Sequence, residues 1–245
     1  VRALPQLSGK ALSAFRQGDI DTLADEVHRC EWELPGQFED VVFHILGMGK
    51  KPRKFEYPRS QEAVVITPFT SDAAIRSIID SCKRPLALVS RTEELALLRD
   101  TTLSSFGHVD VLSDQADAGS EEEVGADSCR GLHAKATVLR CGWQTHLYVG
   151  SANCTDAALV AGRNVEVMAE LVGRTSRGGT PRDWISEKGL GLVLVPYVPV
   201  DSTQLLAERV REDALERCRR VVVRSGLYLD CVGEDGEYRL WLRRT

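Results

Sequence analysis

Two basic side chains in the middle of the chain have a spacing that suits work on phosphate. His133 and Lys135 lie two residues apart in the segment 132–139, LHAKATVL, where apolar residues alternate with other types. This alternation predicts a β-strand, on which residues two apart project from the same face with their backbones roughly 7 Å apart. We therefore expect the imidazole and the ammonium group to face one common space.

The chemistry that this pair favours is the cleavage of a phosphodiester. An imidazole attacks phosphorus or carries a proton, while an ammonium group holds a non-bridging phosphate oxygen. Ser151 and Asn153 follow Gly150 in a Gly-Ser-Ala-Asn turn and would add neutral donors for the same oxygens. They equally suit a turn that caps the helix expected over 155–162, and both roles are compatible. No metal ion is required, because the lysine and the asparagine stabilise the charge.

An acidic residue on a later strand is the candidate that would orient the histidine. The segment 164–172 also alternates, which predicts a strand with Glu166 on its polar face. From there the carboxylate would hydrogen-bond the ring nitrogen of His133 that does not react. The alternative is a strand residue that only contacts solvent.

A Gly-rich loop follows this strand and carries three arginines. Arg174 and Arg177, in the segment 173–183, are candidates for guiding a nucleic-acid backbone at the rim of the site. A loop whose arginines are simply solvated explains the same residues equally well.

The elements that would hold these residues alternate between strands and helices. Short apolar runs bounded by turn residues predict buried strands, and helical periodicity after a Ser71 cap predicts a helix. The resulting order of strands and helices is typical of an α/β layer. Strands are expected at 63–69, 85–90, 109–112, 132–139, 146–150 and 164–172, and helices at 71–82, 91–100 and 155–162.

Changes in composition divide the chain into three parts. Residues 1–61 are expected to form a helical segment that ends in a basic connector, and residues 62–190 to form the α/β domain. Residues 191–245 are expected to form a small α+β extension, with a helix near 202–219 followed by two strands. Residues 113–131 are acidic and aperiodic, which predicts a loop.

The overall composition indicates which kinds of partner and which compartment suit the chain. Its net charge of -5 over 245 residues argues mildly against a general binder of polyanions, although a local basic patch suffices for one. The seven cysteines are scattered, so free thiols in a reducing cytoplasm are expected. We expect no signal peptide, because the first residues lack a hydrophobic stretch, and no apolar run approaches the roughly 20 residues of a membrane span. We expect a cytoplasmic chain that binds neither a membrane nor a cofactor.

Taken together, these residues resemble the signature of the phospholipase D superfamily. HAK at 133–135, GSANCTDAAL at 150–159 and NVEVMAEL at 164–171 follow its pattern of His-any-Lys and then Gly-Ser-any-Asn. The closest resemblance is to bacterial phospholipase D-like proteins of the nuclease and antiviral-defence type. The match covers one half of the family's catalytic unit. The family usually has Asp five residues after the lysine; this chain has Arg140, and the tyrosyl-DNA phosphodiesterase branch also lacks that Asp.

The resemblance implies a mixed β-sheet flanked by helices and a metal-independent phosphodiesterase. In this family two His-Lys sets face each other, one histidine becoming a phosphohistidine while the other protonates the leaving oxygen. One set is present here, so the second is expected from another chain of a homodimer or from an N-terminal half. The helical start and the first residue, which is not Met, favour the second arrangement.

Three functions remain open at this point. The first is a nuclease with nucleic acid as its partner, DNA ahead of RNA, and with His133, Lys135, Ser151, Asn153 and Glu166 as its catalytic set. A phospholipid headgroup phosphodiesterase ranks below it, because the sequence has no amphipathic membrane surface. The third is a non-catalytic phospholipase D-like module for binding or assembly.

Overall fold

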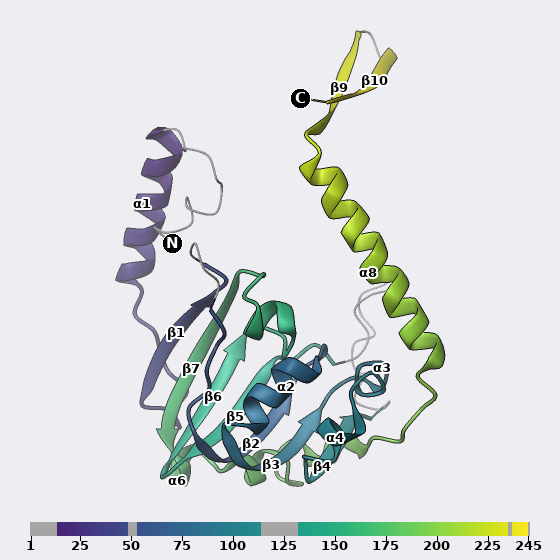
Figure 1. Ribbon diagram of the computed structural model, residues 1–245. Helices are drawn as coiled ribbons and strands as arrows, with labels where there is room; N and C mark the ends of the chain where they lie inside the picture. The colour runs from purple at the N-terminus through teal and green to yellow at the C-terminus, as the bar shows by residue number, and fades with distance from the viewer. Residues whose placement is uncertain (1–13, 49–52, 114–131, 235–236, 245) are drawn as a thin grey trace. The chain divides into compact units, whose positions relative to one another are not determined.

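The structure divides into two units. The computed structural model describes residues 14–48, 53–113, 132–234 and 237–244, and its contacts separate the chain between Pro199 and Val200 (Figure 1). The first unit contains, in chain order, α1 (Ala14–Arg29), β1 (Asp40–Leu46), β2 (Ser60–Ile66), α2 (Asp72–Ile79), β3 (Cys82–Val89), α3 (Thr92–Leu95), α4 (Asp100–Leu103), β4 (His108–Leu112), β5 (Ala136–Cys141), β6 (Gln144–Gly150), the π-helix η3 (Asp156–Val160), β7 (Glu166–Arg174), α6 (Thr175–Gly178), α7 (Pro181–Trp184), the 3₁₀ helix η4 (Leu190–Val193) and β8 (Leu194–Pro196).

The first unit is built on one eight-stranded mixed sheet, which confirms the expected α/β class at this level. The strand order is β1-β7-β6-β5-β2-β3-β4-β8. The pairs β2–β3 and β3–β4 are parallel, and the other neighbours are antiparallel. The parallel strands are connected through helices, because parallel neighbours need a crossover, and the antiparallel strands β5 and β6 are connected by a tight turn.

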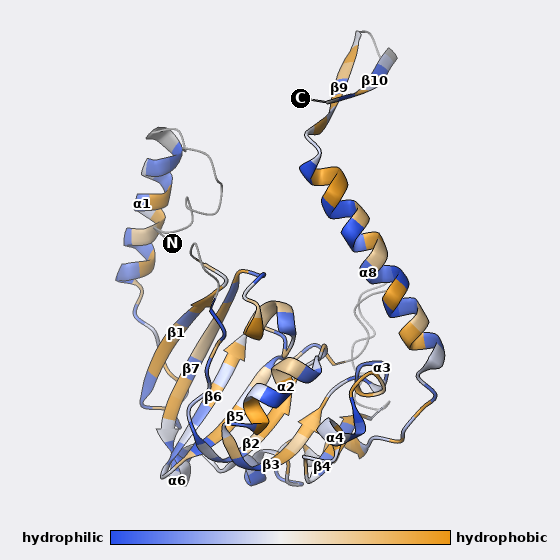
Figure 2. Cartoon of the chain, viewed as in Figure 1, coloured by the Kyte–Doolittle hydropathy of each residue, from blue (hydrophilic) through white to orange (hydrophobic). Residues whose placement is uncertain are grey.

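Both faces of the central strands are buried, because β2 ends in the apolar run 63–66, whose side chains point alternately to the two faces. Ala63 and Val65 belong to the core that includes α2, whereas Val64 and Ile66 belong to the core on the opposite face. Ile75 and Ile78 of α2 are fully buried, and the Ser71 hydroxyl accepts a hydrogen bond from the Ala74 N–H, so the predicted cap is confirmed. Figure 2 shows the central strands as mainly hydrophobic.

Three expectations need correction. Residues 40–46 are not helical but form β1, an edge strand paired with β7. The helix expected over 91–100 is present as two single turns, α3 and α4. The strand expected over 132–139 begins only at Ala136. The acidic loop predicted for 113–131 lies, except for its first residue, outside the described residues.

The second unit is small. It contains α8 (Thr203–Arg224), β9 (Leu227–Glu234) and β10 (Glu237–Arg244), and the two strands pair with each other in an antiparallel ribbon. The helix and two strands expected in the C-terminal extension are therefore present, although the division between the units falls after Pro199 and β8 joins the main sheet. Within the part of the chain that the structure describes, no helix has the length and apolarity of a membrane span.

Candidate functional site

His133 and Lys135 lie just before β5 and border one open hollow. Neither residue is in the strand, so strand alternation does not explain why they share a space. They share it because Ala136, which follows them, pairs with Val149 near the end of β6, and the chain then turns at Ser151. The hollow is lined by His133, Ala134, Lys135, Ala136, Val149, Gly150 and Ser151.

The basic groups are accessible from this hollow. His133 is exposed and Lys135 is half-buried. The Lys135 ammonium group donates to the main-chain carbonyl of His133 at 3.1 Å, which leaves it two further protons. A phosphate oxygen that enters the hollow would therefore meet available donors.

Hydrogen bonds fix the loop after β6 to the end of β2. The Cys154 N–H donates to the Thr67 hydroxyl at 3.0 Å, and the Ser71 N–H donates to the Cys154 carbonyl at 3.0 Å. At the start of the loop, Gly150 runs so close to β7 that a Cβ there would lie 2.1 Å from the Val167 carbonyl oxygen. Glycine is thus required at this position by packing, and the loop that follows is held on both sides.

Ser151 is engaged by the carboxylate of Glu166. The Ser151 hydroxyl donates to Glu166 and accepts from the Val167 N–H at 3.1 Å. The amide of Asn164 donates to the same carboxylate at 3.2 Å. A hydroxyl has a single proton, so Ser151 cannot donate to a phosphate while it holds Glu166.

The role expected for Glu166 differs from the one observed. Among the hydrogen bonds of the described residues, those of Glu166 go to Ser151 and Asn164, and none joins it to His133. Glu166 is buried at the start of β7, on the same side of the strand as Met168. Its hydrogen bond to Ser151 joins the Gly-Ser-Ala-Asn turn to β7.

Asn153 presents a polar atom without a partner. Its Oδ1 is buried and has no hydrogen bond within the described residues. Leaving a buried acceptor unpaired costs about 1–3 kcal/mol. An amide oxygen accepts hydrogen bonds, as phosphate oxygens do, so only the amide N–H groups of Asn153 could donate to a phosphate.

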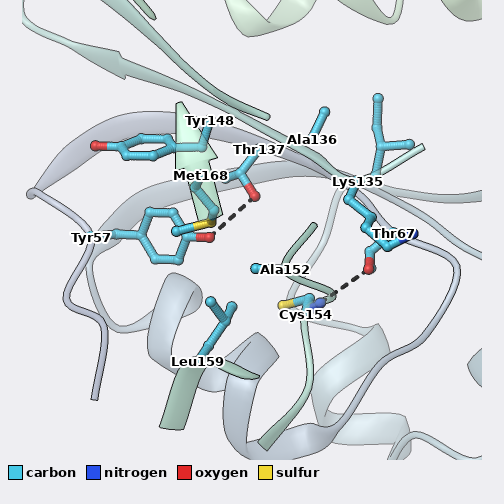
Figure 3. A pocket seen from close by; sticks show the side chains of 11 residues that line it. Tyr57, Thr67, Lys135, Ala136, Thr137, Tyr148, Ala152, Cys154, Leu159 and Met168 are labelled. Carbon is cyan, nitrogen blue, oxygen red and sulfur yellow. Dashed lines mark hydrogen bonds between the residues drawn. The ribbon is translucent and has the colours of Figure 1, made fainter. Parts of the chain in front are cut away.

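A small pocket shares Lys135 and Ala136 with the hollow, and its walls are mostly aromatic and apolar. Figure 3 shows the Tyr57 hydroxyl directed at Thr137, 3.5 Å from its Oγ1, with Met168 beside them. Burial raises the pKa of Tyr57 above its ordinary value, and burial raises the pKa of the Cys154 thiol to about 12. Tyr57 and Cys154 are therefore uncharged, and the charge in the lining of this pocket comes from Lys135.

A second polar cluster stiffens the edge of the sheet. His44 and His146 contact the carboxylate of Glu170 at 2.6 and 2.7 Å, and the Tyr148 hydroxyl donates to it at 2.7 Å. Burial alone would raise the pKa of Glu170, but the hydrogen bonds from His146, Tyr148 and His44 hold it below its ordinary value. The cluster joins β1, β6 and β7 and does not line the His133 hollow.

Arg140, which stands where the family usually has Asp, has a structural partner. Its Nε donates to Glu62 at 3.0 Å, and Arg182 donates to the other oxygen of that carboxylate at 3.0 Å. Arg84 binds Glu62 as well, and the Glu62 side chain is only 3% exposed. Burial alone would raise the pKa of Glu62, but hydrogen bonds from Arg182 and Arg84 and the charge of Arg140 hold it below its ordinary value.

Arg174 and Arg177 are not brought to the hollow. Arg174 ends β7 opposite Gln144, whereas Glu166 starts the same strand beside Ser151. Eight residues of strand separate the two ends by roughly 26 Å. Both arginines approach Glu39, at 3.6 and 3.7 Å, so the register places them away from the expected rim.

One positioning residue was not found from the sequence. The Nε of Arg91 donates to the carbonyl of Leu132 at 3.1 Å, directly before His133, and its guanidinium lies 5.0 Å from the centre of the Phe69 ring. Arg91 thereby fixes the entry to the His133 segment. The sequence carries no signal for it, because Arg91 and Leu132 are brought together only by the sheet.

The side chains that the structure describes form no group of three or more His, Cys, Asp or Glu placed to hold a metal ion. No protein-family model matches the chain, and no curated protein matches it. The likeness to the phospholipase D superfamily accordingly rests on the motif residues themselves.

Proposed function

We propose that the chain is a metal-independent phosphodiesterase that hydrolyses nucleic acid, DNA ahead of RNA. The observation that carries the proposal is the single open hollow bordered by His133, Lys135 and Ser151. A nucleophile, a cation and a polar turn at one hollow are what the transfer of a phosphoryl group needs.

The proposed reaction has two displacement steps. In the first, an imidazole nitrogen of His133 attacks phosphorus, a P–N bond forms, and the bond to the leaving oxygen breaks. The leaving oxygen takes a proton from the histidine of a second His-Lys set. In the second step water attacks phosphorus, gives its proton to that second histidine, and the P–N bond breaks to release His133.

The residues of this chain have separate parts in these steps. Lys135 binds a non-bridging oxygen and offsets the charge that develops on it. Asn153 adds a neutral contact in the same turn. Ser151, whose proton is held by Glu166, acts as a positioning residue that keeps the turn in place. The second set is supplied by another chain or by a further half of the same protein.

The test is cleavage of end-labelled single-stranded and double-stranded DNA and RNA in the presence of EDTA. We expect cleavage by the native chain, its loss in His133→Ala, and its retention in His108→Ala, a change at the start of β4 outside the hollow. Substrate labelled on phosphorus should leave a label on His133 after rapid quenching. Cleavage that EDTA stops, or that persists in His133→Ala, contradicts the proposal.

Two other results would indicate a different function for the hollow. Transfer of the phosphatidyl group from phosphatidylcholine to a primary alcohol, without nucleic-acid cleavage, would identify a lipid phosphodiesterase. Nucleic-acid binding that is equal in the native chain, His133→Ala and Lys135→Ala, again without cleavage, would identify a binding module.

A further inference from the structure

The second unit exposes apolar surface that it cannot bury by itself. No described residue of this unit is buried, although α8 is 22 residues long. A two-stranded ribbon without further strands or a covering helix is marginal in water, and a unit without a core has little to stabilise it. By itself, therefore, the unit has apolar surface that a further contact would stabilise.

The ribbon has one apolar face. Leu229 and Cys231 of β9 pair with Leu242 and Leu240 of β10, and directly paired residues project from the same face. Leu229, Leu240 and Leu242 are 66 to 67% exposed. An exposed face of this kind usually marks an interaction surface.

The helix α8 carries an apolar stripe that is symmetric about its middle. The stripe consists of Ala207, Val210, Ala214, Cys218 and Val221. Successive members are three, four, four and three residues apart, so the spacing is the same when it is counted from either end of the helix. In an antiparallel pair of such helices centred on Ala214, Val210 of one meets Cys218 of the other. This self-complementarity is what a two-fold contact between identical chains requires. Figure 2 shows hydrophobic and hydrophilic segments interleaved along the helix.

The charge along α8 decides the direction of pairing. Residues 203–213 carry three carboxylates and two arginines, a net charge of -1, whereas residues 214–224 carry one carboxylate and four arginines, a net charge of +3. Parallel helices would place the two basic halves together, and antiparallel helices place each basic half against an acidic one. Opposed helix dipoles favour the antiparallel arrangement as well.

We infer that the second unit binds a second copy of the chain, through antiparallel pairing of the two α8 helices and burial of the ribbons' apolar faces. A helix of 22 residues is about 33 Å long, enough for several turns of contact. The inference goes beyond the proposed function, which calls for a second His-Lys set but names no surface that joins two copies.

The test uses the full chain in sedimentation equilibrium, together with circular dichroism over the same range of concentration. We expect a dimer whose dissociation on dilution is accompanied by a loss of helix signal. Val210→Glu should weaken the dimer at least about 100-fold, because each dimer would bury two carboxylates. The matched control Val223→Glu changes a residue that is 81% exposed and lies off the stripe, and it should leave the dimer intact.

The ribbon and the direction of pairing are tested separately. Leu240→Glu should weaken the dimer, and Val232→Glu, on the opposite face of the ribbon, should not. In a background with Cys30→Ser, Cys129→Ser and Cys231→Ser, oxidation should cross-link Val210→Cys to Cys218 of the other copy, while Cys218 alone should remain uncross-linked.

Three results would overturn the inference. They are a monomer with unchanged helix signal at every concentration, equal disruption by Val223→Glu and Val210→Glu, and cross-linking through Cys218 alone, which would require parallel helices. A chain that dimerises but does not cleave nucleic acid refutes the proposed function alone. A monomer that cleaves refutes the dimer alone.

Discussion

Basic side chains lie at both ends of β5, but they differ in exposure and in their hydrogen-bond partners. Before the strand, His133 is exposed and the Lys135 ammonium group has a main-chain carbonyl as its partner beside an open hollow. Toward the other end, Arg140 binds Glu62, which is buried and is also held by Arg84 and Arg182. The Lys135 ammonium group therefore has protons left to donate to a ligand, whereas Arg140 is engaged by a buried carboxylate.

The difference separates a binding role from a structural one. A buried carboxylate is tolerated only when cations and hydrogen bonds offset its loss of water, and Glu62 has three such partners. A cation at an open hollow has water in place of a ligand and can exchange it. Arg140 is therefore part of the scaffold, although it occupies a motif position.

The largest effect that this comparison predicts is on activity. Lys135→Met should reduce nucleic-acid cleavage by about 10²–10³-fold, because it removes the cation that stabilises developing charge, while the melting temperature stays the same. Initial rates and thermal unfolding of the same preparation measure both quantities. Lys83→Met, at an exposed position in β3, is the matched control. Equal losses of activity in the two variants would remove Lys135 from the site.

A change at the Arg140–Glu62 cluster should alter the stability of the fold and not the activity. Glu62→Gln should lower the free energy of unfolding by about 3 kcal/mol, because three arginines lose their common carboxylate. Urea unfolding at neutral pH measures this change, with the exposed Glu93→Gln as control. The cleavage rate per folded molecule should be unchanged, and a selective loss of rate would show that the two ends are coupled.

At low pH, the free energy of unfolding of Glu62→Gln should become equal to that of the native chain. The pKa of Glu62 is below its ordinary value in the folded chain, so the unfolded chain binds more protons in the window between the two values. Stability from this group is present above about pH 4.3, the ordinary value for glutamate, and is lost as the pH falls through the folded pKa. Unfolding curves of both chains between pH 3 and 7 test this, and a gap that widens in acid would contradict the assignment.

The smallest predicted effect concerns positioning. Arg91→Ala should lower kcat about tenfold, or 1.4 kcal/mol, with little change in KM, because the substrate still binds while the His133 segment is less well fixed. Steady-state cleavage kinetics separate the two constants. Arg76→Ala on the exposed side of α2 serves as control. A rise in KM alone would make Arg91 a binding residue.

Local patterns were enough to predict most of the first unit. The apolar runs of β2 and β3 and the capped helix α2 have strong local signals, and all three are present. β1 was mistaken for a helix, although its DVVFHIL sequence is rich in β-branched residues. The alternation in β7 predicted which residues share a face but not which face is buried. Glu166 and Met168, on the side expected to be polar, are buried, whereas Val167 is exposed.

Partners far apart in the sequence could not be predicted. Arg140 and Glu62 are separated by 78 residues and meet only because β2 and β5 are neighbours. Likewise, the engagement of Ser151 by Glu166 depends on the register of β6 and β7. His133, Lys135 and Ser151 were expected to share a site and do border one hollow, but the partners that they contact could not be predicted.

The buried thiol of Cys154, in the small pocket beside Lys135, has a practical consequence for labelling. Alkylating reagents and peroxide attack the thiolate, and with a pKa of about 12 Cys154 is almost entirely protonated at neutral pH. Being buried as well, it resists modification, whereas Cys30, Cys218 and Cys231 are exposed. Fluorophores attached through maleimide would mark the periphery of the protein and leave the pocket beside Lys135 unmodified.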